Sequence, residues 1–214
     1  MSKRDDLGFF SLKEEIPNSV SHGVGAIMSV VGLVFLILLA KSQGTVWHLV
    51  SFSVFGAALV LLYLFSSLYH GVQNIALKRI LRRIDQSAVF VLIAGSYTPF
   101  LLNNLRGPWG WSLFGVVWGL AIFGIISRFF AGETVKRGGL LVYLGMGWLV
   151  IIALKPMLEM VPLNSLLWLA AGGLAYSAGV IFYSWEKMPY SHTVWHLFVL
   201  LGSVSHYFAV INLV

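Results

Sequence analysis

Seven long apolar runs dominate this sequence and constrain its fold more than any other feature. Crossing the hydrocarbon core of a bilayer takes about 20 residues of α-helix, and each run approaches or exceeds that length. The sequence therefore predicts an all-α integral membrane protein with seven transmembrane helices, near residues 20–41, 47–69, 86–103, 109–129, 138–155, 163–184 and 192–213. Turn-forming and charged residues predict the breaks, at Ser42–Gly44, Asn103–Pro108, Gly132–Glu133, Lys155–Pro156 and Glu186–Pro189.

The composition agrees with a membrane location. Of the 214 residues, 58% are hydrophobic and 10% are charged, whereas a soluble domain carries about a quarter charged residues. No polar stretch is long enough for a second domain, so residues 1–214 are expected to form a single membrane domain, with 1–19 as an N-terminal segment. The chain has no cysteine, so a metal site would have to use histidine and carboxylate ligands.

The basic residues predict the orientation of the helices. One side of the predicted membrane has only Lys41, Arg106 and Lys155. The positive-inside rule places the richer side in the cytoplasm, so we expect a multi-pass protein of the inner (cytoplasmic) membrane with Val214 outside. This arrangement explains the net charge of +6 without nucleic acid. The eleven residues on the cytoplasmic side are Lys3, Arg4, Lys13, Lys78, Arg79, Arg82, Arg83, Arg128, Lys136, Arg137 and Lys187.

The segment from Asn74 to Ile84 has an amphipathic pattern. Its isoleucines and leucines can share one face, opposite a face of Lys and Arg. This pattern is typical of a short interfacial helix bound to anionic lipid headgroups, and it predicts such a helix between the second and third spans. The alternative is a basic loop that only sets the topology. The headgroup ligands would be Lys78, Arg79, Arg82 and Arg83.

Three histidines fall at the predicted cytoplasmic edge, although they are far apart in the sequence. His70 ends the second run, and His192 and His196 open the seventh. The last two are four residues apart and therefore lie on one helical face. Three histidines around Zn²⁺ with a fourth position open to water are typical of a catalytic site. The alternative is that they are interfacial side chains in contact with headgroups.

Two further residues suit catalysis at such a site. Asp85 opens the third run at the same edge, where it could hold the water on zinc and act as a base. Ser66 lies one helical turn before His70 and could stabilise an oxyanion. Asp85 could also simply pair with Arg82 or Arg83. Of the remaining histidines, His22 has the right depth but no spacing partner and stays undecided, whereas His48 and His206 are interpreted as unrelated to the site.

These residues belong to motifs that resemble those of the haemolysin III proteins, the bacterial branch of the progestin and adipoQ receptor (PAQR) group. The resemblance covers nearly the whole chain. The motifs are EIPNSVSHG from Glu15, SSLYH ending at His70, Asp85 followed by IAGSYTPF, and HTVWH from His192. Many bacterial relatives carry histidine directly after the aspartate, where this chain has Gln86, which puts a proton relay through that position in doubt.

The resemblance implies a zinc ion near the cytoplasmic face. It implies His70, His192 and His196 as ligands, with Asp85 bound directly or through water and Ser66 nearby. It also implies kinship with zinc-dependent hydrolases of ceramide-like lipid amides. We therefore expect a role in membrane lipid homeostasis, with hydrolysis of a lipid amide or ester as the leading mechanism.

Two other functions compete with hydrolysis. One is a receptor or sensor of membrane lipids in which zinc is structural, and glycine-rich helices that can shift would fit it. Plain helix packing is the favoured explanation of those glycines. The other is the cytolytic activity that the family name records. No run shows a continuous polar stripe that could line an aqueous pore, so the sequence favours an indirect origin for lysis.

Overall fold

The computed structural model describes residues 9–130, 136–185 and 187–214. In this part of the chain all regular structure is helical, and seven helical segments are long and apolar enough to cross a membrane. The predicted fold class is thereby confirmed. The elements are α1 (Leu12–Gln43), α2 (Val46–Gly71), α3 (Ile75–Leu102), α4 (Pro108–Phe130), α5 (Lys136–Gly147), the 3₁₀ helix η2 (Trp148–Ala153), α6 (Leu154–Met160), α7 (Leu163–Ser184) and α8 (Ser191–Ile211).

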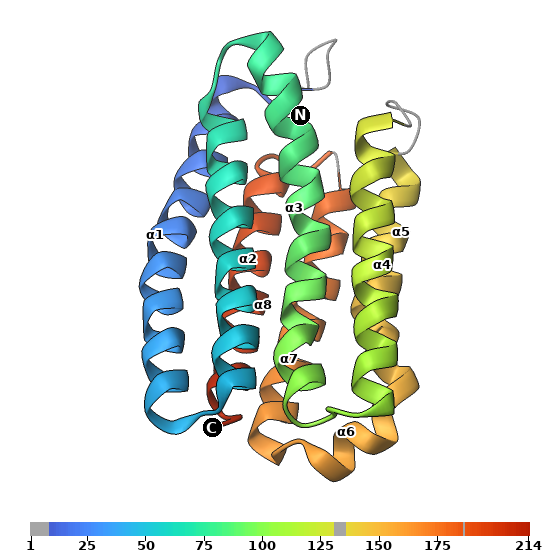
Figure 1. Cartoon of the computed structure of the whole chain (residues 1–214). Helices are drawn as coiled ribbons and strands as arrows, with labels where there is room; N and C mark the ends of the chain where they lie inside the picture. The colour runs from blue at the N-terminus through green and yellow to red at the C-terminus, as the bar shows by residue number, and fades with distance from the viewer. Residues whose placement is uncertain (1–8, 131–135, 186) are drawn as a thin grey trace.

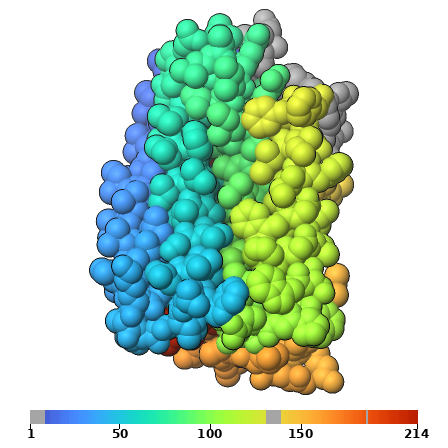
Figure 2. Space-filling view, viewed as in Figure 1, coloured from blue at the N-terminus to red at the C-terminus, as the bar shows by residue number. Residues whose placement is uncertain are grey.

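The helices form a bundle in which most neighbours in sequence also pack in space (Figure 1). α8 closes the arrangement by packing against α1 as well as α7. In the space-filling view, α1, α2, α3 and α4 together form one face of the molecule (Figure 2). The start of α1 and the end of α8 lie at opposite ends of the bundle (Figure 1), as an odd number of spans requires. We call the end that holds the connections at 72–74 and 187–190 the N-terminal end.

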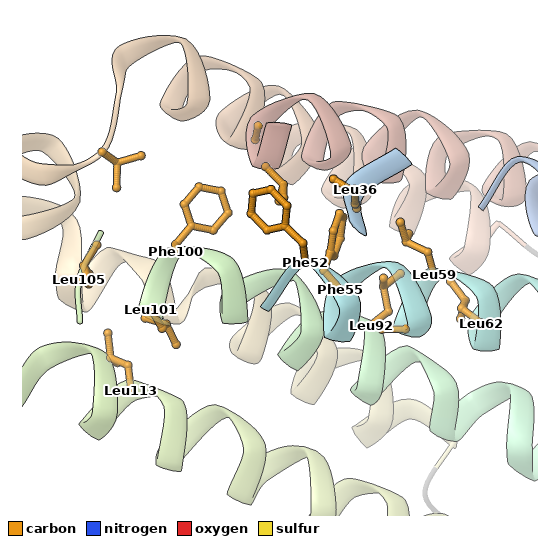
Figure 3. Close-up of a cluster of buried hydrophobic side chains, with 14 of the residues drawn as sticks. Leu36, Phe52, Phe55, Leu59, Leu62, Leu92, Phe100, Leu101, Leu105 and Leu113 are labelled. Atoms are coloured by element: carbon orange, nitrogen blue, oxygen red, sulfur yellow. The ribbon is translucent and has the colours of Figure 1, made fainter. Parts of the chain in front are cut away.

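Aromatic and aliphatic side chains fill the middle of the bundle. Leu36, Phe52 and Phe55 are fully buried and lie close together (Figure 3). On the outside the pattern is reversed, since large apolar residues such as Ile27 and Phe123 are about 70% exposed. In water this exposure would be unfavourable, but a bilayer solvates these side chains. The bundle is therefore built for lipid surroundings, as the sequence predicts.

Two predicted boundaries at the N-terminal end are wrong. α1 begins at Leu12 rather than near residue 20, because its first turns bury polar side chains against the bundle instead of lying in lipid. The expected separate interfacial helix over 74–84 does not form, since α3 runs unbroken from Ile75. Asn74 caps that helix by accepting a hydrogen bond from the backbone N–H of Leu77, and no Gly or Pro follows to break it before Gly95.

The fifth span also differs from its prediction. The segment crosses the membrane region as Gly139–Met160 but changes from α5 to the 3₁₀ helix η2 and then to α6. The expected break at Lys155–Pro156 lies within α6 instead, where proline is tolerated because it stands in the first turn. Tyr97 of α3 supports the irregular part, since its hydroxyl donates to the carbonyls of Met146 and Gly147. The predicted break at Gly132–Glu133 lies outside the described residues.

Candidate metal centre

Three histidines converge at the N-terminal end of the bundle. His70 comes from the last turn of α2, and His192 and His196 come from the first turns of α8. One nitrogen of each lies within 4.8 Å of the others, and the ring centroids are 4.6 to 5.1 Å apart. The structure thus brings together the three residues that the sequence singled out, although α2 and α8 are separated by more than a hundred residues.

Glu15 fixes the orientation of the His70 ring. The Nδ1–H of His70 donates to the carboxylate of Glu15 at 2.5 Å, which leaves the lone pair on Nε2. That Nε2 is buried and has no hydrogen-bond partner in the described part of the chain. Burying a polar atom without a partner costs about 1–3 kcal/mol, so this atom is suited to a cation. A metal ligand that anchors its second nitrogen on a carboxylate is a common arrangement in zinc sites.

His196 is oriented in the same way from α1. Its Nδ1 lies 3.1 Å from the backbone carbonyl oxygen of Asn18 and 3.2 Å from the hydroxyl of Ser21. A carbonyl oxygen can only accept, so Nδ1 carries the proton and Nε2 is available to a metal. The side chain of Asn18 accepts from the hydroxyl of Thr193 at 2.6 Å, which links α1 directly to the α8 turn that carries the histidines.

Lys78 completes this network from α3. Its ammonium lies 2.9 Å from the Glu15 carboxylate and donates to the backbone carbonyls of Tyr69 and Val72. The expectation that Lys78 contacts lipid headgroups is therefore wrong, since the residue is only 4% exposed. A buried carboxylate needs a compensating charge, and Lys78 supplies it. Arg79 and Arg83 on the same helix are exposed, and Arg82 is half-buried.

Asp85 and Ser66 lie beside the cluster rather than in it. The histidine cluster of the described residues, whose ligand atoms lie within 4.8 Å of one another, does not include Asp85. Asp85 and Ser66 interact with each other and line a cavity that His192 and His196 also line. No ion pair within 4.0 Å joins Asp85 to Arg82 or Arg83 among the described residues, and Arg82 interacts with Asp85 electrostatically from a greater distance.

The cavity next to these residues is large and mostly apolar. It has a volume of about 1210 Å³ and extends from His192 at the N-terminal end to Leu163 and Met157 near the opposite end. Leucine, valine and aromatic side chains make up most of its wall. Such a cavity can hold an acyl chain, with the polar residues at one end of it.

The other three histidines lie outside this cluster. His22, undecided from the sequence, stacks on His196 with ring centroids 3.5 Å apart but lies outside the cluster of three. His48 forms a cap with Thr45 at the opposite end of the bundle. His206 contacts Tyr176 edge-on and lines the cavity away from the cluster. Gln86 also lines the cavity, and its backbone carbonyl accepts from Tyr143.

Sequence reasoning missed Glu15, Asn18 and Lys78 as parts of this centre. A signal for the first two existed in the spacing of the N-terminal motif. Glu15, Asn18, His22 and Gly25 recur at three- and four-residue steps and are all buried on one face of α1. No comparable signal marks Lys78, because it stands among three other basic residues with the same local pattern.

Comparison with known proteins agrees with this architecture. The chain is 46% identical over 200 residues to hemolysin-3 of Bacillus cereus, covering 94% of this chain and 91% of the relative. It is 48% identical over 205 residues to the hemolysin-3 homolog of Bacillus subtilis (strain 168), covering 94% and 95%. It is also 29% identical over 206 residues to the human monocyte to macrophage differentiation factor, covering 92% and 83%, which is consistent with the PAQR relation.

The family description agrees with these pairwise similarities. The family model described as "Haemolysin-III related" matches residues 10–207, and this range includes every residue of the centre described above. The chain is therefore a multi-pass membrane protein that belongs to the haemolysin III-related family.

Proposed function

We propose that this protein is a membrane-embedded zinc hydrolase that cleaves a lipid amide or ester and acts in membrane lipid homeostasis. The observation that carries the proposal is the pair of oriented histidines, His70 and His196, whose Nδ1 atoms are held by acceptors so that Nε2 is free for a metal. His192 supplies the third nitrogen. When bound there, zinc would supply a Lewis acid and activate a water molecule.

The residues beside the histidines have distinct roles in this proposal. The Asp85 carboxylate takes a proton from the attacking water and returns it to the leaving group. The Ser66 hydroxyl donates a hydrogen bond to the oxyanion that develops on the carbonyl. Both line the cavity, so both can face a substrate bound there. The apolar wall excludes water and holds the acyl chain, with the scissile bond at the N-terminal end.

The orientation in the membrane is part of the same proposal. The excess of basic residues at the N-terminal end supports a cytoplasmic location for the metal centre, in an inner membrane. The exposed Arg79 and Arg83 are placed to contact anionic headgroups on that side. A lipid substrate would then be drawn from the cytoplasmic leaflet.

The proposal is tested by product release in lipid nanodiscs that contain a lipid amide or an ester. The comparison is between zinc-loaded wild type, Asp85→Asn and the distant control His48→Ala. We expect turnover in wild type and in His48→Ala and its loss in Asp85→Asn, with zinc retained in all three. Turnover that survives in Asp85→Asn, or no product from any lipid amide or ester, would contradict the proposal.

A second candidate function is a lipid sensor with structural zinc. The observation that favours it is that the centre joins α1, α2, α3 and α8 through Glu15, Lys78, His70 and His196. A metal there would pin four helices at one end of the bundle. Lipid-dependent change in helix packing without any product would favour this alternative over hydrolysis.

A further inference from the structure

The cavity carries a cluster of cationic side chains at the same end as the histidines. Arg82 from α3, Arg128 from α4 and Lys187 from the connection before α8 all line it. Among the described residues that line the cavity, Asp85 is the one carboxylate. Three separate elements thus direct positive charge toward a largely apolar cavity, next to the proposed reaction site.

Membrane topology does not explain where these side chains point. The positive-inside rule accounts for basic residues at this end of the bundle, and Arg79 and Arg83 fit it because they are exposed. Arg82 and Arg128 are instead half-buried and line the cavity. On α3, Arg79 and Arg83 are therefore exposed, whereas Arg82 lines the cavity.

Arg128 is held in place by neutral groups. Its guanidinium donates to the hydroxyl of Tyr143 at 3.2 Å and lies over the Tyr143 ring. That hydroxyl donates in turn to the backbone carbonyl of Gln86 at 2.7 Å. Gly139 leaves the space that the guanidinium occupies, since a Cβ there would collide with Arg128. Among the described residues, the groups that hold this arginine in position are therefore neutral.

The guanidinium groups retain unused binding capacity. An arginine has five N–H donors, and Tyr143 takes one of those of Arg128. In the described part of the chain, no ion pair within 4.0 Å joins a carboxylate to Arg82 or Arg128. Asp85 acts on Arg82 from a greater distance, and Arg82 also lies over the ring of Phe9. Partly buried charge of this kind requires an anionic partner. Guanidinium groups match phosphate and carboxylate oxygens especially well.

We infer that the cavity binds a lipid with a phosphate-bearing headgroup, held by Arg82 and Arg128 with Lys187 at the rim. This inference names the substrate class and rests on the proposed function. A phosphate monoester carries a charge of about −1.5 to −2 and three acceptor oxygens, which matches three cations better than a single carboxylate does. The acyl chain lies along the apolar wall formed by residues such as Val89, Leu92 and Leu166.

The test measures binding of defined amphiphiles to the purified full-length protein in neutral detergent, by native mass spectrometry and calorimetry. The probes are oleoyl lysophosphatidate, oleate, neutral monooleoylglycerol and inorganic phosphate. The variants are Arg82→Gln and Arg128→Gln, and their controls are Lys41→Gln and Arg106→Gln, which remove the same charge from exposed positions at the opposite end of the bundle. Thermal unfolding of each variant confirms that it is folded.

We expect lysophosphatidate to bind more tightly than the other three probes. Each cavity variant should weaken its binding at least about tenfold, since a charge-assisted hydrogen bond is lost, and each control by less than about twofold. Equal losses in cavity and control variants would overturn the inference in favour of bulk surface charge. So would binding of oleate, monooleoylglycerol or inorganic phosphate as tight as that of lysophosphatidate.

Failure of the headgroup site can be distinguished from failure of the hydrolase proposal. Binding is measured on protein both with and without zinc, and zinc content is determined separately. Loss of the proposed metal with intact lysophosphatidate binding would remove the hydrolase and keep the headgroup site. Zinc-dependent turnover with no preference for the phosphate lipid would keep the hydrolase and remove the headgroup site.

Discussion

The Glu15 carboxylate accepts a hydrogen bond from Nδ1 of His70 at 2.5 Å, across 55 residues of sequence. The same carboxylate pairs with Lys78 at 2.9 Å. Glu15, which precedes the first predicted membrane run, thereby sets the orientation of the His70 ring on α2. It also balances the charge of Lys78 on α3. The N-terminal turns of α1 are consequently part of the candidate metal centre rather than a leader to it.

Replacing Glu15 tests this role directly. Glu15→Gln replaces the charged acceptor of His70 with a weaker neutral one and removes the counter-charge 2.9 Å from Lys78, so the His70 ring is held less firmly. Zinc affinity, measured by competition with a chelator, should fall about 10- to 100-fold, as for other residues that orient metal ligands. Glu159→Gln is the matched control because that side chain is 61% exposed. Equal affinities in Glu15→Gln and wild type would contradict the positioning role.

The thermal stability of the protein should depend on the same Glu15–Lys78 ion pair. Lys78→Met removes the ammonium that lies 2.9 Å from the buried Glu15 carboxylate, and loss of one partner of a buried ion pair is strongly destabilising, at about 3–5 kcal/mol. The double variant Glu15→Gln with Lys78→Met removes both charges, and we expect it to unfold at a higher temperature than Lys78→Met alone. Thermal unfolding in detergent measures both. Additive losses in the double variant would show that the two residues act independently.

Ser66 and Asp85 should affect turnover without affecting metal content. Ser66→Ala removes one donor to the proposed oxyanion and should lower the turnover rate about 10²- to 10³-fold. Asp85→Asn removes the proposed base and should lower the rate about 10²- to 10⁴-fold. Zinc analysis of both variants should match wild type. Zinc loss in Asp85→Asn would instead assign that carboxylate as a direct ligand.

Close packing of α1 predicts a specific glycine effect. A Cβ on Gly25 would lie 2.8 Å from both the Leu200 and the Tyr63 side chains, so Gly25→Ala should destabilise the bundle by about 1–3 kcal/mol. Gly119→Ala is the control, since nothing lies within 4 Å of its added carbon. The two variants are compared by thermal unfolding in the same detergent. Equal unfolding temperatures would show that α1 can move away from α2 and α8.

Much of the fold can be predicted from the sequence because a bilayer restricts the backbone structures that can cross it. Spans must be helical, since every backbone group needs an internal partner in lipid, and apolar run length then predicts their number. The 3₁₀ turn at Trp148–Ala153 could not be predicted in this way. This turn is stabilised by hydrogen bonds from Tyr97 on α3, and no local pattern in residues 138–155 predicts that contact.

The candidate site was predictable in part for a similar reason. Depth in the membrane is readable from the sequence, so His70, His192 and His196 could be assigned to one layer. The contacts between neighbouring helices within that layer cannot be predicted in the same way. Lys78 and Arg79 are adjacent basic residues, yet one is buried against Glu15 and the other is exposed. Only the rotation of α3 about its axis separates them, and packing against α2 and α4 sets that rotation.

The most direct test of the central claim is the zinc content of the detergent-purified protein, compared among wild type, His196→Ala and the distant control His48→Ala. The account predicts about one zinc per chain in wild type and in His48→Ala, and its loss in His196→Ala. Wild-type protein without zinc, or His196→Ala with its zinc intact, would contradict the claim that these three histidines form a metal centre.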